Sequence, residues 1–116
     1  MLGLGPAVNS FHQNAESNWI AQMEPELWNK TAHYLLISGY HIFKLTGQCK
    51  DAIASQVGYL PFDFKRHCWA DPGDWKWRAL PIKGSMLPEL VDAGHKIGVI
   101  TEAASRDTGI PLGLPV

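Results

Sequence analysis

Tryptophan is the residue type best suited to contact a ligand in this sequence, and three of its five copies lie close together at Trp69, Trp75 and Trp77. Flat indole rings pack well against C–H faces, so the three could form a stacking surface for a sugar ring. The competing interpretation is that they complete a small core, because each large aromatic side chain buries about 150–250 Å². On a short helix Trp75 and Trp77 would lie about 200° apart, which favours the packing interpretation.

The other residue types that catalyse reactions are scattered along the chain. No two histidines form the i, i+4 pair that a metal-binding helix requires, and no serine stands in a nucleophile elbow. Asp71 and Asp74 are expected to serve as turn and cap residues. From chemistry alone we predict no catalytic residue, no cofactor-binding residue and no metal site among these side chains: His12, His33, His41, His67, His95, Ser38, Ser55, Ser85 and Ser105.

The two cysteines, Cys49 and Cys68, cannot build a disulfide framework. We expect both to pack as small hydrophobic side chains. His67 precedes Cys68, but no second pair of ligands stands at a zinc-site spacing. The first five residues lack the basic start and long apolar stretch of a secretion signal, and we therefore expect a reducing, cytoplasmic setting.

Length and composition exclude several classes of protein. The 116 residues, 46% hydrophobic and 18% charged, suit one globular domain at most. Ten basic and eleven acidic residues give a net charge of −1, so no positive field is available to attract nucleic acid or an anionic membrane. No apolar run approaches the ~20 residues of a membrane span.

The elements that must position these residues begin with two short helices. Pro25 suits the first position of a helix that runs to about Lys30, with acidic residues at the positive end of its dipole. Ser38 can cap a second helix, which Gly47 would stop in the left-handed conformation. The apolar residues of this second helix that we expect to point inward are Tyr40, Phe43 and Leu45.

Two further helices are predicted nearer the C-terminus. Residues 69–74 form a turn in which the proline presets φ and Gly73 takes a positive φ. Asp74 then caps a short helix that carries Trp75 and Trp77. Thr101 opens the clearest helix in the chain, which Gly109 closes.

The strand predictions rest on short apolar runs. Residues 33–37 are predicted to form a buried strand, residues 57–64 an edge strand and residues 97–100 a short strand. Residues 51–56 are ambiguous between a helical turn and a strand. Residues 1–18 show no steady period and are expected to be irregular.

Several motifs follow one another in a fixed order through most of the chain. They are EPELWNKT at 24–31, LISGYHIFKLTG at 36–47, DAIASQVGYLPFD at 51–63, WKW at 75–77, LPELV at 87–91, GVITEAA at 98–104 and TGIPLGLPV at 108–116. Each piece is weak by itself. The ordered series, over residues 19–116, resembles the middle of the N-terminal domain of FGGY-family carbohydrate kinases.

This resemblance implies an α+β fold: a fragment of a ribonuclease-H-like domain of the actin and hexokinase type, with short helices and a few strands. FGGY kinases use ATP and magnesium to phosphorylate a hydroxyl of a sugar or polyol. The family's phosphate loop lies at the start of its chain, and its catalytic Asp follows the segment that matches residues 113–116. Neither position exists here, so the resemblance carries over no catalytic, ATP-binding or magnesium-binding residue.

We therefore expect a kinase fragment that is inactive alone and that self-associates through uncovered strand edges and apolar patches. The alternative is a stand-alone carbohydrate- or protein-binding module derived from the kinase scaffold. Residues 1–18 match the family poorly: Trp19 fits its Lys-apolar-x-Trp-apolar run, but Glu16 replaces the lysine and Ser17 replaces an apolar residue. The sequence selects neither one sugar nor one origin for residues 1–18.

Overall fold

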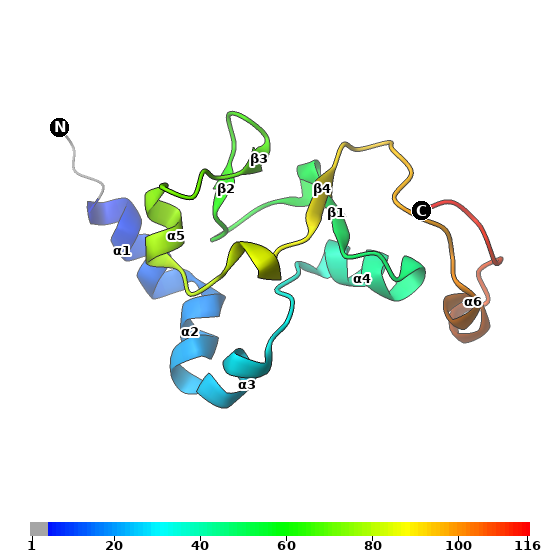
Figure 1. Ribbon diagram of the computed structural model, residues 1–116, viewed down its shortest axis with the longest axis horizontal. Helices are drawn as coiled ribbons and strands as arrows, with labels where there is room; N and C mark the ends of the chain where they lie inside the picture. The colour runs from blue at the N-terminus through cyan, green and yellow to red at the C-terminus, as the bar shows by residue number, and fades with distance from the viewer. Residues whose placement is uncertain (1–4) are drawn as a thin grey trace. The chain divides into compact units, whose positions relative to one another are not determined.

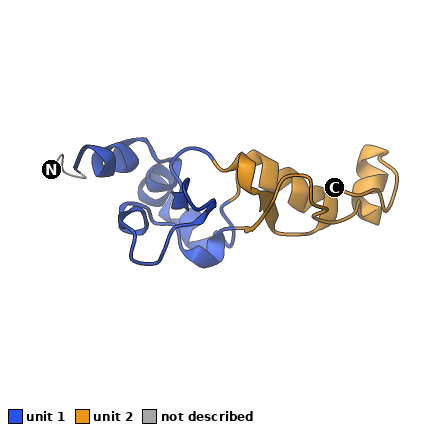
Figure 2. Ribbon diagram, turned by 90° about the horizontal axis from the view of Figure 1, so that it is seen from above, with its two compact units in different colours: residues 1–34, 57–87 blue, residues 35–56, 88–116 orange. Residues whose placement is uncertain are grey.

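The computed structural model describes residues 5–116, which divide into two compact units (Figure 2). Unit 1 comprises Met1–Tyr34 and Val57–Leu87, and unit 2 comprises Leu35–Gln56 and Pro88–Val116. Each unit therefore joins two stretches that are far apart in the sequence. Helices and small sheets occur together, which confirms the expected α+β class.

Unit 1 is mainly helical (Figure 1). Its helices are α1 (Gly5–Asn14), α2 (Glu16–Met23), α3 (Pro25–Lys30) and α5 (Trp75–Ala79), and a 3₁₀ turn, η2, covers Gly84–Met86. The prediction of an irregular N-terminal segment is wrong for residues 5–18, and its first four residues lie outside the described part of the chain.

Tertiary contacts explain why α1 and α2 form despite their weak periodicity. The ring of Phe11 meets Tyr59 and Trp75 edge-on, at centroid distances of 5.2 and 4.9 Å. The buried Asn18 donates from Nδ2 to the backbone oxygen of Ala79 at 2.9 Å. Helices this short gain most of their stability from such packing, which a sequence period does not reveal.

The starts of α3 and α5 were predicted correctly from local capping rules. Pro25 occupies the first turn of α3, as predicted. The Asp74 carboxylate caps α5 by accepting a hydrogen bond from the backbone N–H of Lys76 at 2.9 Å. The preceding turn closes through the Asp74 N–H, which donates to the oxygen of Asp71 at 2.8 Å. Gly73 does not take the positive φ that we predicted, so this turn does not depend on glycine.

A short antiparallel hairpin completes unit 1. Strand β2 (Phe62–Asp63) pairs with β3 (Cys68–Trp69), so the edge strand expected over residues 57–64 is reduced to two residues. The Asp63 carboxylate builds the turn, since its Oδ1 accepts from the N–H groups of Lys65 and Arg66 at 2.9 and 3.0 Å.

Unit 2 contains a parallel pair of strands. Strand β1 (Lys50–Ala52) pairs with β4 (Glu89–Val91), with Asp51 opposite Leu90. The ambiguous segment 51–56 holds both kinds of structure, because β1 leads directly into the 3₁₀ turn η1 (Ile53–Ser55). The pairing of β4 with β1, which is far away in the sequence, was not predicted.

The helices of unit 2 are α4 (Ile37–Thr46) and α6 (Glu102–Thr108). Both end at glycines in the left-handed conformation, as predicted: Gly47 has φ 73° and Gly109 has φ 76°. Thr101 caps α6, since its side chain accepts from the N–H of Ala104 at 3.2 Å.

Three predictions for α4 are wrong. Leu36, not Ser38, stands at the N-cap position, and the Ser38 hydroxyl is used elsewhere. Tyr40 and Phe43 were expected to point inward, but they are 49% and 41% exposed. Leu45 is half-buried.

Two of the predicted strands do not form. Residues 33–36 have no regular structure, and the Tyr34 N–H donates to the oxygen of Met86 at 2.8 Å within unit 1. Residues 97–100 make one isolated bridge, between Val99 and Pro115. An apolar run without a neighbouring strand in register remains irregular.

Candidate functional site

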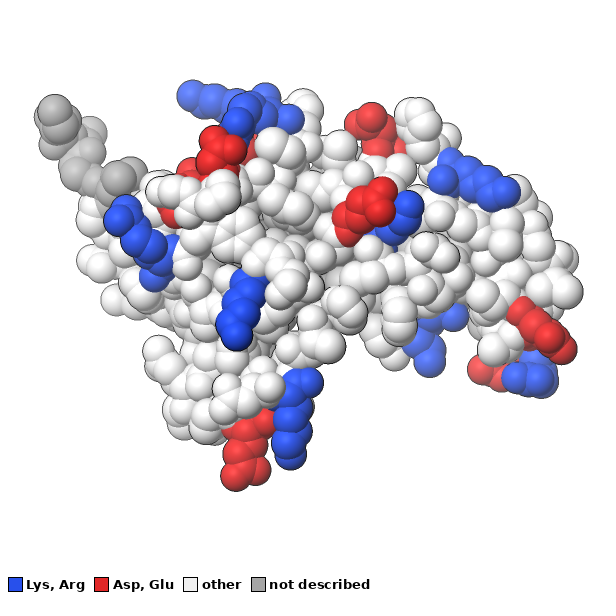
Figure 3. All heavy atoms as spheres, viewed as in Figure 1, with Lys and Arg blue, Asp and Glu red and all other residues white. Residues whose placement is uncertain are grey.

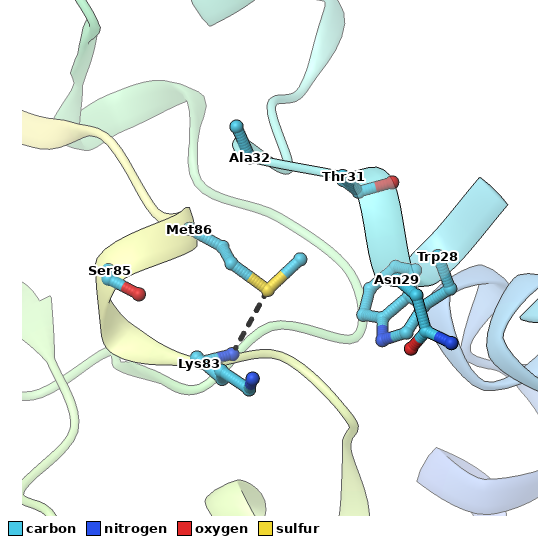
Figure 4. Close-up of a pocket in the computed structure, with 7 residues that line it drawn as sticks. All are labelled: Trp28, Asn29, Thr31, Ala32, Lys83, Ser85 and Met86. Carbon is cyan, nitrogen blue, oxygen red and sulfur yellow. Dashed lines mark hydrogen bonds between the residues drawn. The ribbon is translucent and has the colours of Figure 1, made fainter. Parts of the chain in front are cut away.

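Unit 1 contains a pocket of about 350 Å³ between the end of α3 and η2 (Figure 4). One wall comes from α3 and the residues just after it, and the other comes from η2 and the residue before it. The first wall consists of Trp28, Asn29, Thr31 and Ala32, and the second of Lys83, Ser85 and Met86.

Backbone hydrogen bonds fix both walls. The Met86 N–H donates to the oxygen of Lys83 at 2.9 Å, and the Lys83 N–H approaches Met86 Sδ at 3.4 Å (dashed in Figure 4). The Tyr34 N–H donates to the oxygen of Met86, which ties the segment after α3 to η2. The pocket is therefore formed before any ligand binds.

The lining side chains are suited to binding rather than to catalysis. Lys83 is the one charged residue among those that line the pocket, and none of the lining residues is a carboxylate, histidine or cysteine. The half-buried ring of Trp28 meets Tyr34 edge-on at 5.9 Å. Desolvation raises the pKa of Tyr34, with a further contribution from Glu16.

The three tryptophans singled out above each pack against a different residue. Each is half-buried and has its own packing partner, as the core-packing interpretation predicts. Trp69 lies edge-on to a ring at 5.8 Å, Trp75 does the same at 4.9 Å, and Trp77 donates from Nε1 to a backbone oxygen at 3.0 Å. The partners, in that order, are Phe62, Phe11 and Ala70.

The acidic residues near this hairpin form ion pairs that stabilise turns. Arg66 lies between two carboxylates, with Nε 2.9 Å from Asp63 and Nη2 2.8 Å from Asp71. The Arg66 side-chain hydrogen bond, followed by the two backbone bonds, lowers the pKa of Asp63 to about 2. The two carboxylates in turn raise the pKa of Arg66. A carboxylate of such low pKa is a poor proton acceptor, so it does not suit a general base.

Within residues 5–116, no group of three or more His, Cys, Asp or Glu side chains is placed to hold a metal ion. None of the five histidines lines the pocket. Cys49 and Cys68 are not joined by a disulfide and are half-buried, less buried than predicted, and burial raises the pKa of Cys49.

The most buried carboxylate in the described residues was not predicted from the sequence. Asp51 is fully buried, and it accepts from the Ser38 hydroxyl at 2.9 Å and from the Ala52 N–H at 2.8 Å. A Cβ added to Gly39 would lie 3.1 Å from Asp51 Oδ2, so the helix backbone packs directly on the carboxylate. No spacing rule links Ser38 to Asp51, because the contact joins a helix to a strand.

The distribution of charged side chains and the length of the helices agree with what the composition predicted. Acidic and basic side chains are interspersed over the face drawn in Figure 3. In the part of the chain that the structure describes, no helix has the length and apolar character needed to cross a membrane.

Comparison with known families gives a match to the N-terminal domain of the FGGY family of carbohydrate kinases. The match covers residues 4–116, so it begins well before residue 19, where the resemblance was expected to start. The matched range therefore includes most of residues 1–18, which were expected to match the family poorly.

Curated relatives are kinases by name. The uncharacterized sugar kinase YgcE of Escherichia coli K12 is 35% identical over 85 residues, which is 73% of this chain and 17% of that protein. L-fuculokinase of the same organism is 27% identical over 112 residues, covering 97% of this chain and 23% of its own length. Autoinducer-2 kinase of Klebsiella pneumoniae is 30% identical over 103 residues, covering 84% of this chain and 18% of its own length.

Proposed function

This chain belongs to the FGGY family of carbohydrate kinases, and we propose that it forms part of the N-terminal domain of an enzyme that transfers a phosphoryl group from ATP to a hydroxyl of a sugar or polyol. The observation that carries this proposal is the family match over residues 4–116. The chain spans 17% to 23% of the length of the three relatives described above. Two of those relatives, L-fuculokinase and autoinducer-2 kinase, are named for different substrates, so the proposal stays at the level of the substrate class.

We further propose that these 116 residues do not phosphorylate a sugar by themselves. Phosphoryl transfer needs positioned phosphates, a metal ion and a group that accepts the proton of the attacking hydroxyl. The described residues supply no cluster of metal ligands, and the pocket of unit 1 has no proton acceptor of the carboxylate or histidine type. No step of the reaction is therefore assigned to a residue of this chain.

An assay of ADP release tests the inactivity directly. The purified chain is incubated with ATP, Mg²⁺ and, in turn, L-fuculose, D-xylulose and glycerol, with full-length L-fuculokinase as the positive control. We expect no sugar-dependent ADP release above the rate without sugar. Sugar-dependent turnover that rises in proportion to the concentration of the chain would overturn this part of the proposal.

A chimera tests the assignment to a kinase domain. Residues 4–116 replace the matching segment of E. coli L-fuculokinase, and we expect the chimera to keep fuculose-dependent activity. A matched chimera with Asp51→Leu, which places an apolar side chain at a buried hydrogen-bonded position, should unfold at a lower temperature. A chimera that melts cooperatively near the parent enzyme but lacks all kinase activity would contradict the assignment.

Location and assembly are also part of the proposal. We place the protein in the cytoplasm, where ATP is available and cysteines outside a disulfide, such as Cys49 and Cys68, remain reduced. We also propose self-association, supported by three large apolar side chains along α2 and α3: Trp19, Met23 and Leu27 are 60%, 63% and 59% exposed. The comparisons give no support to the alternative of a stand-alone binding module.

A further inference from the structure

We propose that the pocket between α3 and η2 binds a phosphorylated sugar or polyol. The proposal does not rest on the proposed function, because binding here requires no phosphoryl transfer. It rests on three features of the pocket: its volume, its indole wall, and the single cation on the opposite wall.

Volume and the indole wall indicate the ring-shaped part of the ligand. A pocket of about 350 Å³ lies at the small end of the range for small-molecule sites. Trp28 is half-buried and held edge-on against Tyr34, so its ring is a fixed wall of the pocket (Figure 4). A flat apolar ring beside amide and hydroxyl groups suits a molecule that has both C–H faces and hydroxyls.

Lys83 indicates the phosphate. It lines the wall opposite Trp28, and no acidic residue lines the pocket to neutralise it (Figure 4). An ammonium group with uncommitted donors favours an anion, and phosphate oxygens are strong acceptors. Ser85 and Asn29 add a hydroxyl and an amide, which can donate to a phosphate or exchange hydrogen bonds with sugar hydroxyls.

Other ligand classes fit the lining less well. A metal ion or an organic cation would meet Lys83 without a carboxylate to hold it. A purely apolar ligand would leave the amide, hydroxyl and ammonium groups without partners. A nucleoside triphosphate carries several charges, and one lysine is too little to balance them.

The pocket is rigid enough to select a ligand. Thr31 donates from Oγ1 to the oxygen of Leu27 at 2.9 Å, which fixes the end of α3. The ring of Trp77 lies against η2, since a Cβ on Gly84 would lie 3.8 Å from it. Preformed walls lower the entropy lost on binding, so even a site with one charge can discriminate between ligands.

The test is an NMR titration of the whole chain with three probes at constant ionic strength: D-glucose 6-phosphate, D-glucose and inorganic phosphate. We expect saturable shifts at the Trp28 indole N–H and the Ser85 amide with the sugar phosphate. Its dissociation constant should be at least about tenfold lower than that of either other probe, since a hydrogen bond between charged groups contributes about 1.5–3 kcal/mol.

Two lysine variants localise the charge effect. Lys83→Met should weaken glucose 6-phosphate binding to the level of glucose. Lys96→Met, at an exposed lysine of unit 2 that does not line the pocket, should leave it unchanged. Lys83 is exposed, so its substitution should not unfold the chain, and the dispersion of the amide spectrum checks this.

Three outcomes would overturn the proposal. The first is the absence of saturable shifts up to about 20 mM glucose 6-phosphate, a concentration that still reveals a weak site. The second is equal affinity for glucose and glucose 6-phosphate, and the third is a Lys83→Met variant that binds like the original chain. Each is independent of the ADP-release assay, so failure here does not affect the proposed function.

Discussion

The hydroxyl of Ser38 donates a hydrogen bond of 2.9 Å to Oδ2 of Asp51, and this contact joins α4 to β1 in unit 2. Asp51 has no exposed surface, so its carboxylate depends on donors within the protein. The second oxygen accepts from the Ala52 N–H at 2.8 Å. The buried carboxylate therefore fixes how the helix lies on the strand that follows it.

Removing the Ser38 hydroxyl should destabilise the chain. Ser38→Ala leaves one oxygen of a buried carboxylate without this donor, and we expect the free energy of unfolding to fall by about 1.5–3 kcal/mol. Urea unfolding measures the change, and Ser85→Ala, at an exposed position, is the control. A loss for Ser38→Ala no larger than that of the control would contradict the role given to this contact.

Ser17→Ala should stabilise the chain. Ser17 is 1% exposed, and its hydroxyl is buried without a hydrogen-bond partner in the described structure. The substitution removes a desolvation penalty of about 1–3 kcal/mol and also raises helix propensity. Ser105→Ala, in the middle of α6, measures the propensity effect alone. Equal gains from the two variants in urea unfolding would show that the Ser17 hydroxyl carries no penalty.

Gly98→Ala should destabilise unit 2 through a steric clash. A Cβ at this position would lie 2.9 Å from Cβ and 3.2 Å from Cγ2 of Thr46. Thr46 resists rotation, since its hydroxyl donates to the oxygen of Ile42 at 2.7 Å. We expect a loss of about 1–3 kcal/mol, as for other overpacked sites. Gly73→Ala is the control, because nothing lies within 4 Å there, and a similar thermal shift in both variants would argue against the clash.

Stability should fall in acid as Asp63 takes up a proton. The pKa of Asp63 is lowered to about 2 in the folded chain, against an ordinary value of about 3.9. A lowered carboxyl pKa gives stability that is fully present above the ordinary value and is lost as the pH falls from about 4 to about 2. Asp63→Asn should remove this part of the pH dependence in urea unfolding.

A carboxyl titration followed by ¹³C NMR checks the cause. Arg66→Met removes the largest contribution, the side-chain hydrogen bond, and should move the Asp63 midpoint up toward its ordinary value. The backbone bonds from Lys65 and the residue at position 66 remain and should keep it somewhat below that value. An unchanged midpoint in Arg66→Met would refute the assigned cause.

The apolar residues on α2 and α3 should control self-association. Replacing Trp19, Met23 and Leu27 together by Gln should raise the dimer dissociation constant by about tenfold or more, since apolar contact area is lost. Leu112→Gln, at a residue 64% exposed in unit 2, is the comparison variant. Analytical ultracentrifugation over a concentration series gives the constants, and a strictly monomeric original chain would rule the association out.

The sequence predicted those parts of the fold that depend on neighbouring residues. Pro25, Asp74 and Thr101 mark helix starts through local geometry, and Gly47 and Gly109 mark helix ends through positive φ. Each of these effects acts over one turn of chain, so the residue type is enough to predict it.

Predictions from the sequence were wrong or missing where a structural feature depends on a residue far away in the chain. Residues 33–37 have a strand-like composition, but no strand pairs with them. Strand β4 directly follows a proline, which does not favour a strand, and yet it pairs with β1. Ser38 was expected to cap its own helix, and the buried Asp51 competes for its hydroxyl. The pocket was also missed, because Trp28 and Lys83 are brought together by the Tyr34–Met86 backbone bond.

The parallel pairing of β1 with β4 has a consequence for synthesis. Lys50–Ala52 emerges from the ribosome well before Glu89–Val91, and residues 57–87 between them belong to unit 1. Strand β1 therefore remains unpaired while the polypeptide between the two strands is translated, because it can pair only when β4 has been made and the loop between them has closed. During that interval the nascent chain exposes a strand that chaperones or neighbouring chains can capture.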